Sequence, residues 1–498
     1  MRIIAAFASS CLTATQNTPI GRPYESFYEQ LCNPDMLLSL SYKTGMIGLI
    51  SLVLLPKHLD RSEKWCLELD KALNDADRTG TVVSTVSTLL RGSLSLFRSL
   101  LMATMMGSQS SDSSRPSSSA SNSRFESDNT SDSERGADIS RSNSARNSQF
   151  AAFSQALFDT AYRAQTLRCI IDSLRRYRKY IDGLILIDVS QILSDLVHTS
   201  NKFIVQFIDC NGLDCLNEAM IFESCISFSP SLELKPDPDD ILSVNVKFLH
   251  EEPLIAVLQM CSHLARNSEA YFECLQQTFT AEYLVRLLLQ LNSAIRSKTC
   301  NLIGNFCRHS SIWYRGLRED VFIRCKTTVS GPTTPLSVLI RCCEDADSAT
   351  RKFACFAVGN AAFHTADLYE QLATAIHPLL SALDDDDEKT RANAAGALGN
   401  LVRNGHDLAP ALCNAGVIDR LIVMSMHETK LFPQRIALFS LGTMAGHTDC
   451  RNRILKTKYG INEVLHYLKL TEPMAGDETM QKYLIRLRSK LKRQTPPS

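Results

Sequence analysis

Asparagine and arginine recur at one place in an internal repeat, and their chemistry is that of recognition. An asparagine directly follows a glycine at three places: Asn305, Asn360 and Asn400. A degenerate fourth copy has threonine in the same place, at Thr443, and Arg308 and Arg403 stand four residues after two of the glycines. An amide offers a hydrogen-bond donor and acceptor together, and a guanidinium is a permanent cation with several donors. These side chains can hold another molecule, and we expect no bond-breaking chemistry from them.

Patterns for catalysis or metal binding are not recognisable in the chain. No Ser/His/Asp set and no G-x-S-x-G motif stands out. Histidines recur after the repeated segments: His309, His364, His406 and His447. They belong to different repeats, which helix packing separates by ~10 Å, so they are not expected to converge on one ion. We therefore predict no catalytic residue, no metal and no cofactor.

Acidic clusters precede two of the repeated segments. One is Asp384–Glu388 and the other is Glu344–Ser348. Carboxylates in front of a helix can accept hydrogen bonds from its free backbone N–H groups and meet the positive end of its dipole. The alternative is a divalent metal site, but consecutive aspartates lack the alternating spacing and turn glycine of a calcium loop. We expect helix caps.

The C-terminal stretch predicts a basic amphipathic helix. Apolar residues at helical spacing, including Leu484 and Leu487, alternate with six cations. The cations are Lys482, Arg486, Arg488, Lys490, Lys492 and Arg493. The helix could contact tubulin, an acidic protein or a membrane surface. We favour the alternative that it caps the last repeat, as solenoids require, and the two roles are compatible.

The spacing of the repeats predicts the fold. The four glycines, at 304, 359, 399 and 442, lie 55, 40 and 43 residues apart, and apolar residues between them follow helical spacing. A period near 40–45 with helical units is the signature of armadillo or HEAT arrays. We predict an all-α, right-handed superhelical solenoid whose concave face binds other proteins or peptides.

Composition excludes several classes of function. Lys+Arg and Asp+Glu are both 53 in 498 residues, so no basic excess favours a nucleic acid backbone. The apolar run 46–56 is shorter than the ~17–25 residues of a membrane-spanning helix. The N-terminus resembles a signal peptide only faintly. Seventeen cysteines with no C-x-x-C pair indicate reduced, buried thiols. We expect a cytoplasmic protein without a transmembrane segment.

Four segments are predicted along the chain. Residues 1–106 form a helical region of possible degenerate repeats, and residues 150–475 form the armadillo-like repeats. Between them, 107–149 is serine-rich and nearly without large apolar residues, so it should be disordered, with Arg-x-x-Ser patterns open to phosphorylation. Residues 476–498 form the basic C-terminal helix and tail.

Three motifs resemble the C-terminal region of the Fused-type serine/threonine kinases. They are the segments 300–310, 356–364 and 391–401. The chain departs from that family because it has no G-x-G-x-x-G loop, V-A-I-K strand, H-R-D loop or D-F-G aspartate. The resemblance implies a non-catalytic scaffold in Hedgehog-type signalling or ciliary and microtubule assembly, with kinesin-like or axonemal partners and an association with cilium or cytoskeleton.

The same resemblance gives the asparagines a role and leaves two rival functions open. In many armadillo proteins the asparagine of this motif hydrogen-bonds an extended peptide; alternatively, each asparagine bonds only its own helix end or the next repeat. One rival function is a fragment of an active kinase whose catalytic domain lies upstream of Met1. The other is a peptide-binding transport adaptor. The adaptor is disfavoured because Asn301, Phe356 and Gly396 stand where import-type arrays have tryptophan.

Overall fold

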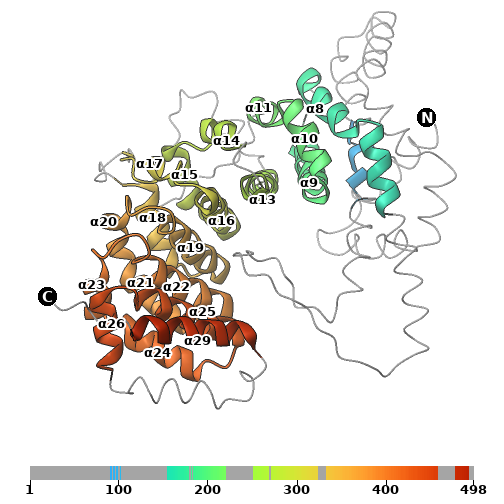
Figure 1. Ribbon diagram of the computed structural model, residues 1–498. Helices are drawn as coiled ribbons and strands as arrows, with labels where there is room; N and C mark the ends of the chain where they lie inside the picture. The colour runs from blue at the N-terminus through green and yellow to red at the C-terminus, as the bar shows by residue number, and fades with distance from the viewer. Residues whose placement is uncertain are drawn as a thin grey trace, which may run out of the picture. The chain divides into compact units, whose positions relative to one another are not determined.

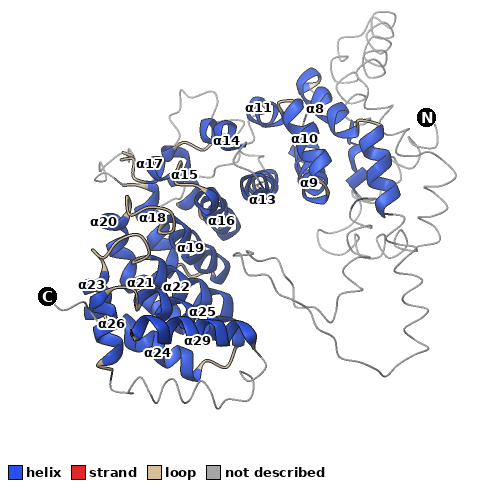
Figure 2. Ribbon diagram, viewed as in Figure 1, coloured by secondary structure: helices blue, strands red, loops and turns tan. Residues whose placement is uncertain are grey.

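The computed structural model describes most of the repeat region and part of the N-terminal region. The described residues are 154–178, 181, 183–219, 251–267, 271–322, 333–457 and 477–492, with scattered helical positions between 90 and 101. Every element longer than one residue in these ranges is helical, and the one isolated bridge joins Val321 to Thr333 (Figure 2). The all-α prediction is confirmed. Most of 1–106, all of 107–149, and Arg493 lie outside the described residues.

The chain divides into two compact units. The first comprises Met1–Ile221 with Phe248–Pro253, and the second comprises Phe222–Lys247 with Leu254–Ser498. In the first unit lie α8 (Thr166–Arg176), α9 (Gly183–Thr199), α10 (Asn201–Asp209) and α11 (Gly212–Glu218).

The helical stretch that begins at residue 154 is interrupted at one point. The chain turns at Gln165, whose φ is 54°. The left-handed residue ends one helical stretch and α8 starts immediately after it. Buried Ile170, Leu193 and Phe203 then form part of this unit's core.

The second unit is a series of helical repeats, each ending in a long helix. Shorter helices come between successive long ones in chain order (Figure 1). The long helices are α13 (Glu252–Asn267), α16 (Ser293–His309), α19 (Ser348–Ala361), α22 (Glu388–Asn400), α25 (Leu431–Met444) and α29 (Glu478–Leu491). The shorter ones are α14 (Phe272–Thr278), α15 (Ala281–Leu288), α17 (Tyr314–Leu317), α18 (Pro335–Arg341), α20 (Tyr369–Leu372), α21 (Ile376–Ser381), α23 (Ala409–Asn414), α24 (Val417–His427) and α26 (Thr448–Leu455).

Helices α16, α19, α22, α25 and α29 pack against one another in that order and form the spine of the second unit. The glycine of the repeated motif faces the next long helix. A Cβ atom on Gly399 would lie 2.5 Å from the hydroxyl oxygen of Ser440 on that helix. A Cβ on Gly359 would lie 3.2 Å from that of Ala397. At these two positions a larger residue would push successive repeats apart, whereas at Gly442 a Cβ would meet only Arg486, at 3.8 Å.

The acidic clusters cap the long helices, as predicted. The carboxylate of Asp347 accepts a hydrogen bond from the N–H of Thr350 at 2.8 Å, at the start of α19. Asp387 does the same for Thr390 at 2.8 Å, at the start of α22. Each satisfies one backbone donor that a helix N-terminus leaves without a partner.

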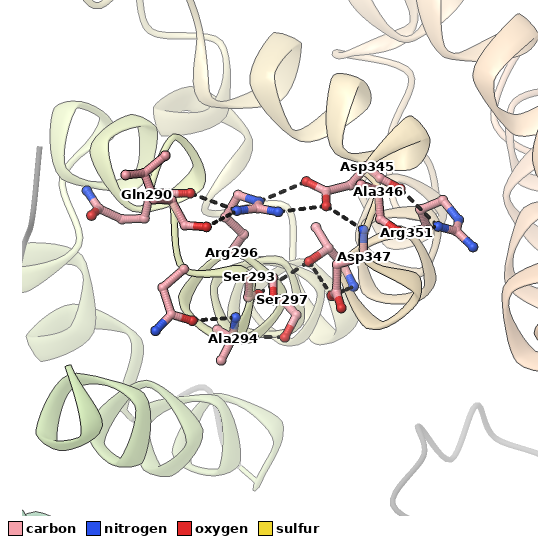
Figure 3. Close-up of polar contacts among 12 residues, drawn as sticks. Gln290, Ser293, Ala294, Arg296, Ser297, Asp345, Ala346, Asp347 and Arg351 are labelled. Carbon is pink, nitrogen blue, oxygen red and sulfur yellow. Dashed lines mark hydrogen bonds and ion pairs between the residues drawn. The ribbon is translucent and has the colours of Figure 1, made fainter. Parts of the chain in front are cut away.

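An acidic residue near the start of each of α19, α22, α25 and α29 joins that repeat to the previous one. Asp345 and Asp385 stand two residues before the capping aspartates, and Asp477 is itself the cap of α29. The pairs are Arg296–Asp345, Arg351–Asp385, Arg391–Glu428 and Arg435–Asp477. We call this series the arginine ladder. In the Arg296 rung, Nε and Nη2 donate to the two carboxylate oxygens of Asp345 at 2.8 and 2.7 Å (Figure 3). A guanidinium matches a carboxylate in this two-point geometry.

Three of the ladder arginines, Arg296, Arg351 and Arg391, also hold the loops in front of their own helices. Nη1 of Arg296 donates to the carbonyls of Gln290 and Leu291, both at 2.8 Å (Figure 3). Arg351 repeats the pattern with the carbonyls of Asp345 and Ala346 at 3.0 and 3.1 Å. One guanidinium therefore fixes the loop of its own repeat and the loop of the following repeat.

The ladder changes the acidity of its carboxyl groups. Burial by itself raises the pKa of Asp385, but the Arg351 guanidinium and the backbone N–H of Asp387 outweigh burial and hold that pKa below its ordinary value. The pKa of Asp345 is lowered in the same way by Arg296, and the pKa of Glu428 by Arg391. The ionised carboxylates are thus the forms that the fold stabilises.

We expect the contribution of Asp385 to depend on pH. Because its folded pKa is depressed, its stabilisation is complete above the ordinary pKa of about 4 and is lost as pH falls through the lower folded pKa. Asp385→Asn should therefore lower the urea unfolding midpoint most at pH 7, and this deficit should shrink below about pH 4. The helical circular dichroism signal of the full chain gives the urea midpoints of wild type and variant at each pH.

Asp384→Asn is the matched control, because Asp384 is 68% exposed in its pair with Arg420. Asp384→Asn should lower the urea unfolding midpoint only slightly at every pH, as removal of a surface ion pair generally does. A deficit for Asp385→Asn that stays constant from pH 7 to pH 3 contradicts the role assigned to the ionised carboxylate.

Candidate partner-binding site

Three positions on each long helix face the same way. They lie three residues before, one after and four after the repeated glycine, a spacing that places them on one side of a helix. On α19 these positions are Phe356, Asn360 and Phe363, all half-buried. The other members are Asn301, Asn305 and Arg308 along α16, Gly396, Asn400 and Arg403 along and just beyond α22, and Phe439 on α25. We call this surface the long-helix face.

The predicted asparagines lie on this face, with their amide nitrogens used between repeats. Nδ2 of Asn360 donates to the carbonyl of Gly304 on the preceding long helix at 2.8 Å, and Nδ2 of Asn400 donates to that of Gly359 at 2.9 Å. Asn305 donates to the hydroxyl of Ser262 at 2.8 Å and is only 5% exposed. The structure therefore supports the inter-repeat alternative for the donors, and peptide binding by the asparagines stays a prediction.

The two predicted arginines occupy equivalent places but have different surroundings. The guanidinium of Arg403 lies over the ring of Phe363, 4.0 Å from its centroid, in a cation–π contact between neighbouring repeats. Arg308 is half-buried, and its Nη1 has no hydrogen-bond partner among the described residues. Both side chains reach the long-helix face.

Two of the recurrent histidines, His309 and His364, connect the C-terminal ends of successive long helices by hydrogen bonds. Nε2 of His309 bonds the carbonyl of Arg266 at 2.7 Å, and Nε2 of His364 bonds that of Arg308 at 3.1 Å. In the next repeat Asn404 stands at the position of the histidine, and its Nδ2 donates to the carbonyl of Phe363 at 2.9 Å. His406, two residues further on, is exposed. No group of three or more potential metal ligands occurs among the residues the structure describes.

The C-terminal helix packs onto the last complete repeat. In α29, Met480, Leu484 and Leu487 are buried against the unit, while Lys482 and Lys492 are exposed. The guanidinium of Arg486 lies 4.9 Å from the ring centroid of Phe439 on α25. The structure thus places α29 as a capping helix, and contact of its basic residues with a partner stays a prediction.

Aromatic rings under the cations are features that the sequence analysis did not identify. Phe363 and Phe439 stand at the same offsets from their glycines as Arg403 and Phe356. That register is the signal that could have revealed them.

No helix in the described ranges is long and apolar enough to cross a membrane.

We expect Asn400→Ala to weaken the stack. The change removes a hydrogen bond to Gly359 in a half-buried place, which costs about 1 kcal/mol of unfolding free energy. Chemical denaturation of the full chain measures this loss of unfolding free energy. Asn414→Ala, at the exposed end of α23, should change stability by less than about 0.5 kcal/mol. Equal effects of the two substitutions would show that the Asn400 amide is not structural.

Comparisons with known proteins agree with the repeat architecture. A family model described as a HEAT-like repeat matches residues 337–401. An engineered protein solved by the Northeast Structural Genomics Consortium shares the fold with a TM-score of 0.53 at 15% identity, over 90% of this chain and 100% of that one. A designed armadillo repeat protein in complex with peptide (KR)4 has a TM-score of 0.43 at 18% identity, over 55% of this chain and 98% of that one.

Two relatives carry kinase names. Serine/threonine-protein kinase 36 of Pongo abelii is 28% identical over 247 residues, which make up 48% of this chain and 17% of that protein. Serine/threonine-protein kinase TIO of Arabidopsis thaliana is 33% identical over 229 residues, 43% of this chain and 16% of that protein. This chain thus spans about a sixth of the length of these relatives. Over nearly half of its own length it is similar to the Fused-type serine/threonine kinases, as its motifs predicted, and its repeats have the armadillo/HEAT-like fold.

Proposed function

We propose that this chain is a non-catalytic protein-interaction scaffold that binds a partner along the long-helix face. The observation that carries the proposal is the register of that face. Successive helices present partly exposed asparagine, phenylalanine and arginine at the same three positions, so that one extended partner can contact several repeats. The resemblance to Fused-type kinases supports a scaffold role in the same kind of assembly.

We also propose a setting for that scaffold. It is Hedgehog-type signalling or ciliary and microtubule assembly, with kinesin-like or axonemal proteins as partners and a cytoplasmic, cytoskeletal or ciliary location. The similarity to two proteins named as serine/threonine kinases, which links this chain to that family, supports the setting.

One specific observation favours a second function. Because the kinase-named relatives are about six times longer than the matched region, this segment can also serve as the regulatory part of a kinase polypeptide. A transcript that extends upstream of Met1 into an H-R-D motif distinguishes that case, in which the scaffold would bring substrates to an attached catalytic domain.

Proximity labelling in cells tests the scaffold, with the full chain as bait. The informative variant is Gly396→Gln, which obstructs the long-helix face with a neutral side chain. A Cβ at Gly396 contacts only Cγ2 of Ile436, at 3.4 Å, and the change removes a helix-weakening glycine, so the fold should be retained. The control is Gly316→Gln on α17, where a Cβ has no neighbour within 4 Å.

We expect wild type and Gly316→Gln to label the same kinesin-like, axonemal or Hedgehog-pathway proteins and Gly396→Gln to lose them. If Gly396→Gln keeps every partner at matched thermal stability, the long-helix face is not the binding surface. If none of these proteins is labelled by wild type, the family-level role does not apply to this chain.

A further inference from the structure

Cationic side chains from successive repeats gather along the long-helix face. They come from α13, α16, α19, α29 and the end of α22, and we call them the cationic stripe: Arg266, Lys298, Arg308, Lys352, Arg403 and Arg486. Neighbouring members lie close enough to repel one another. Burial and the nearby Arg266 lower the pKa of Arg308, and burial and the nearby Arg486 lower the pKa of Arg403. Burial and the nearby Lys352 likewise lower the pKa of Lys298.

The contacts of these cations within the fold are with neutral groups. Nζ of Lys298 donates to the amide oxygen of Gln259 at 2.9 Å, and Nζ of Lys352 lies 5.2 Å from the ring centroid of Phe353. Arg403 and Arg486 lie over phenylalanine rings. Neither an amide nor a ring cancels a full positive charge, so the stripe keeps an attraction for anions.

The carboxylates that could have neutralised the stripe are engaged elsewhere. Asp345, Asp385 and Glu428 receive the ladder arginines near the N-terminal ends of the long helices. Arg308 and Arg403 follow the ladder arginines Arg296 and Arg391 by twelve residues, so they lie at or just beyond the C-terminal ends of their helices. These two guanidinium groups are therefore separated along the helix from the ladder carboxylates.

We propose that the long-helix face binds an extended acidic segment of a partner protein, whose carboxylates pair with Arg308, Arg403 and Arg486. Guanidinium groups suit this task because they form two-point hydrogen bonds with carboxylates. Phe363 and Phe439 keep Arg403 and Arg486 in place, and their rings contact the aliphatic parts of the segment. Arg308 as a residue is half-buried, but its Nη1 atom is buried without an acceptor in the described part of the fold, so a carboxylate of the segment must meet this guanidinium at its other nitrogens.

A peptide suits this surface better than a nucleic acid does. The chain has zero net charge, so it lacks the long-range attraction that a polyphosphate strand requires. Asn301, Asn360 and Gly396 interrupt the cations with neutral positions along the face. This mixture matches a peptide in which acidic residues alternate with neutral ones.

Fluorescence anisotropy with the full chain tests the proposal. The probe is a labelled 16-residue peptide of alternating glutamate and serine; the comparison ligands are its lysine–serine counterpart and a 12-residue oligo-dT. We expect the acidic peptide to bind, the basic one not to bind, and the acidic peptide's Kd to rise at least tenfold between 50 and 300 mM NaCl. The double variant Arg308→Gln/Arg403→Gln should raise that Kd at least tenfold at 50 mM NaCl.

Arg318→Gln/Arg341→Gln is the matched control, because it removes the same charge from two exposed arginines outside the stripe and should change Kd less than twofold. A second variant, Gly396→Glu, places a carboxylate beside the stripe without removing any of its contacts and should weaken the acidic peptide more than Gly396→Gln does. Failure of the acidic peptide to bind, equal loss in the control pair, or tighter binding of oligo-dT overturns the proposal.

This inference rests on the proposed scaffold function, but the two can fail separately. If Gly396→Gln loses its cellular partners while Arg308→Gln/Arg403→Gln keeps them, the face binds proteins but not through acidic groups. If the acidic peptide binds as expected while Gly396→Gln keeps every cellular partner, the stripe recognises acidic groups and the scaffold proposal fails in its stated form.

Discussion

The pairing of an arginine in one repeat with a carboxylate in the next is the interaction on which the second unit depends. A single repeat cannot bury its own apolar surface, so its stability comes from contact with its neighbours. Apolar packing is not directional, whereas the two-point pairs of Arg296 with Asp345 and of Arg391 with Glu428 accept only a narrow range of geometries. Arg351 bonds Asp385 through Nε and also holds the carbonyls of its own loop, so it fixes the position of one helix start relative to the next.

The ladder also determines where charge is available for function. At the N-terminal ends of the long helices, arginines and carboxylates satisfy each other, and Asp385 is only 5% exposed there. Near the C-terminal end of α22, by contrast, Arg403 meets the ring of Phe363 and pairs with no carboxylate among the described residues. This helix therefore carries a structural end and an end that can bind a partner.

Much of this architecture could be predicted because the repeat is short and regular. The glycine spacing predicts stacked helices, and the acidic clusters predict caps, which Asp347 and Asp387 provide. Arg296, Arg351 and Arg391 stand at a constant offset before their glycines, but their partners could not be read from the sequence. Asp345 is 49 residues beyond Arg296, and only the stacking brings the two together.

The limits of sequence reasoning at the candidate site have a similar physical cause. An asparagine amide can serve a peptide or a neighbouring helix, and the choice depends on which carbonyl the packing presents. For Asn400 that carbonyl belongs to Gly359. The rings of Phe363 and Phe439 support cations from other repeats, a relation that the spacing within one helix does not reveal. The right-handed superhelix stays a prediction.

A double-mutant cycle on Arg351 and Asp385 tests the central role of the ladder most directly. Native-state hydrogen exchange of the α19 and α22 amides gives the local opening free energy for Arg351→Gln, Asp385→Asn and the double variant. We predict a coupling energy of about 1–3 kcal/mol between the two side chains, against less than about 0.5 kcal/mol for the exposed pair Arg420 and Asp384. Additive effects at Arg351 and Asp385, with no more coupling than at the exposed pair, would contradict the account.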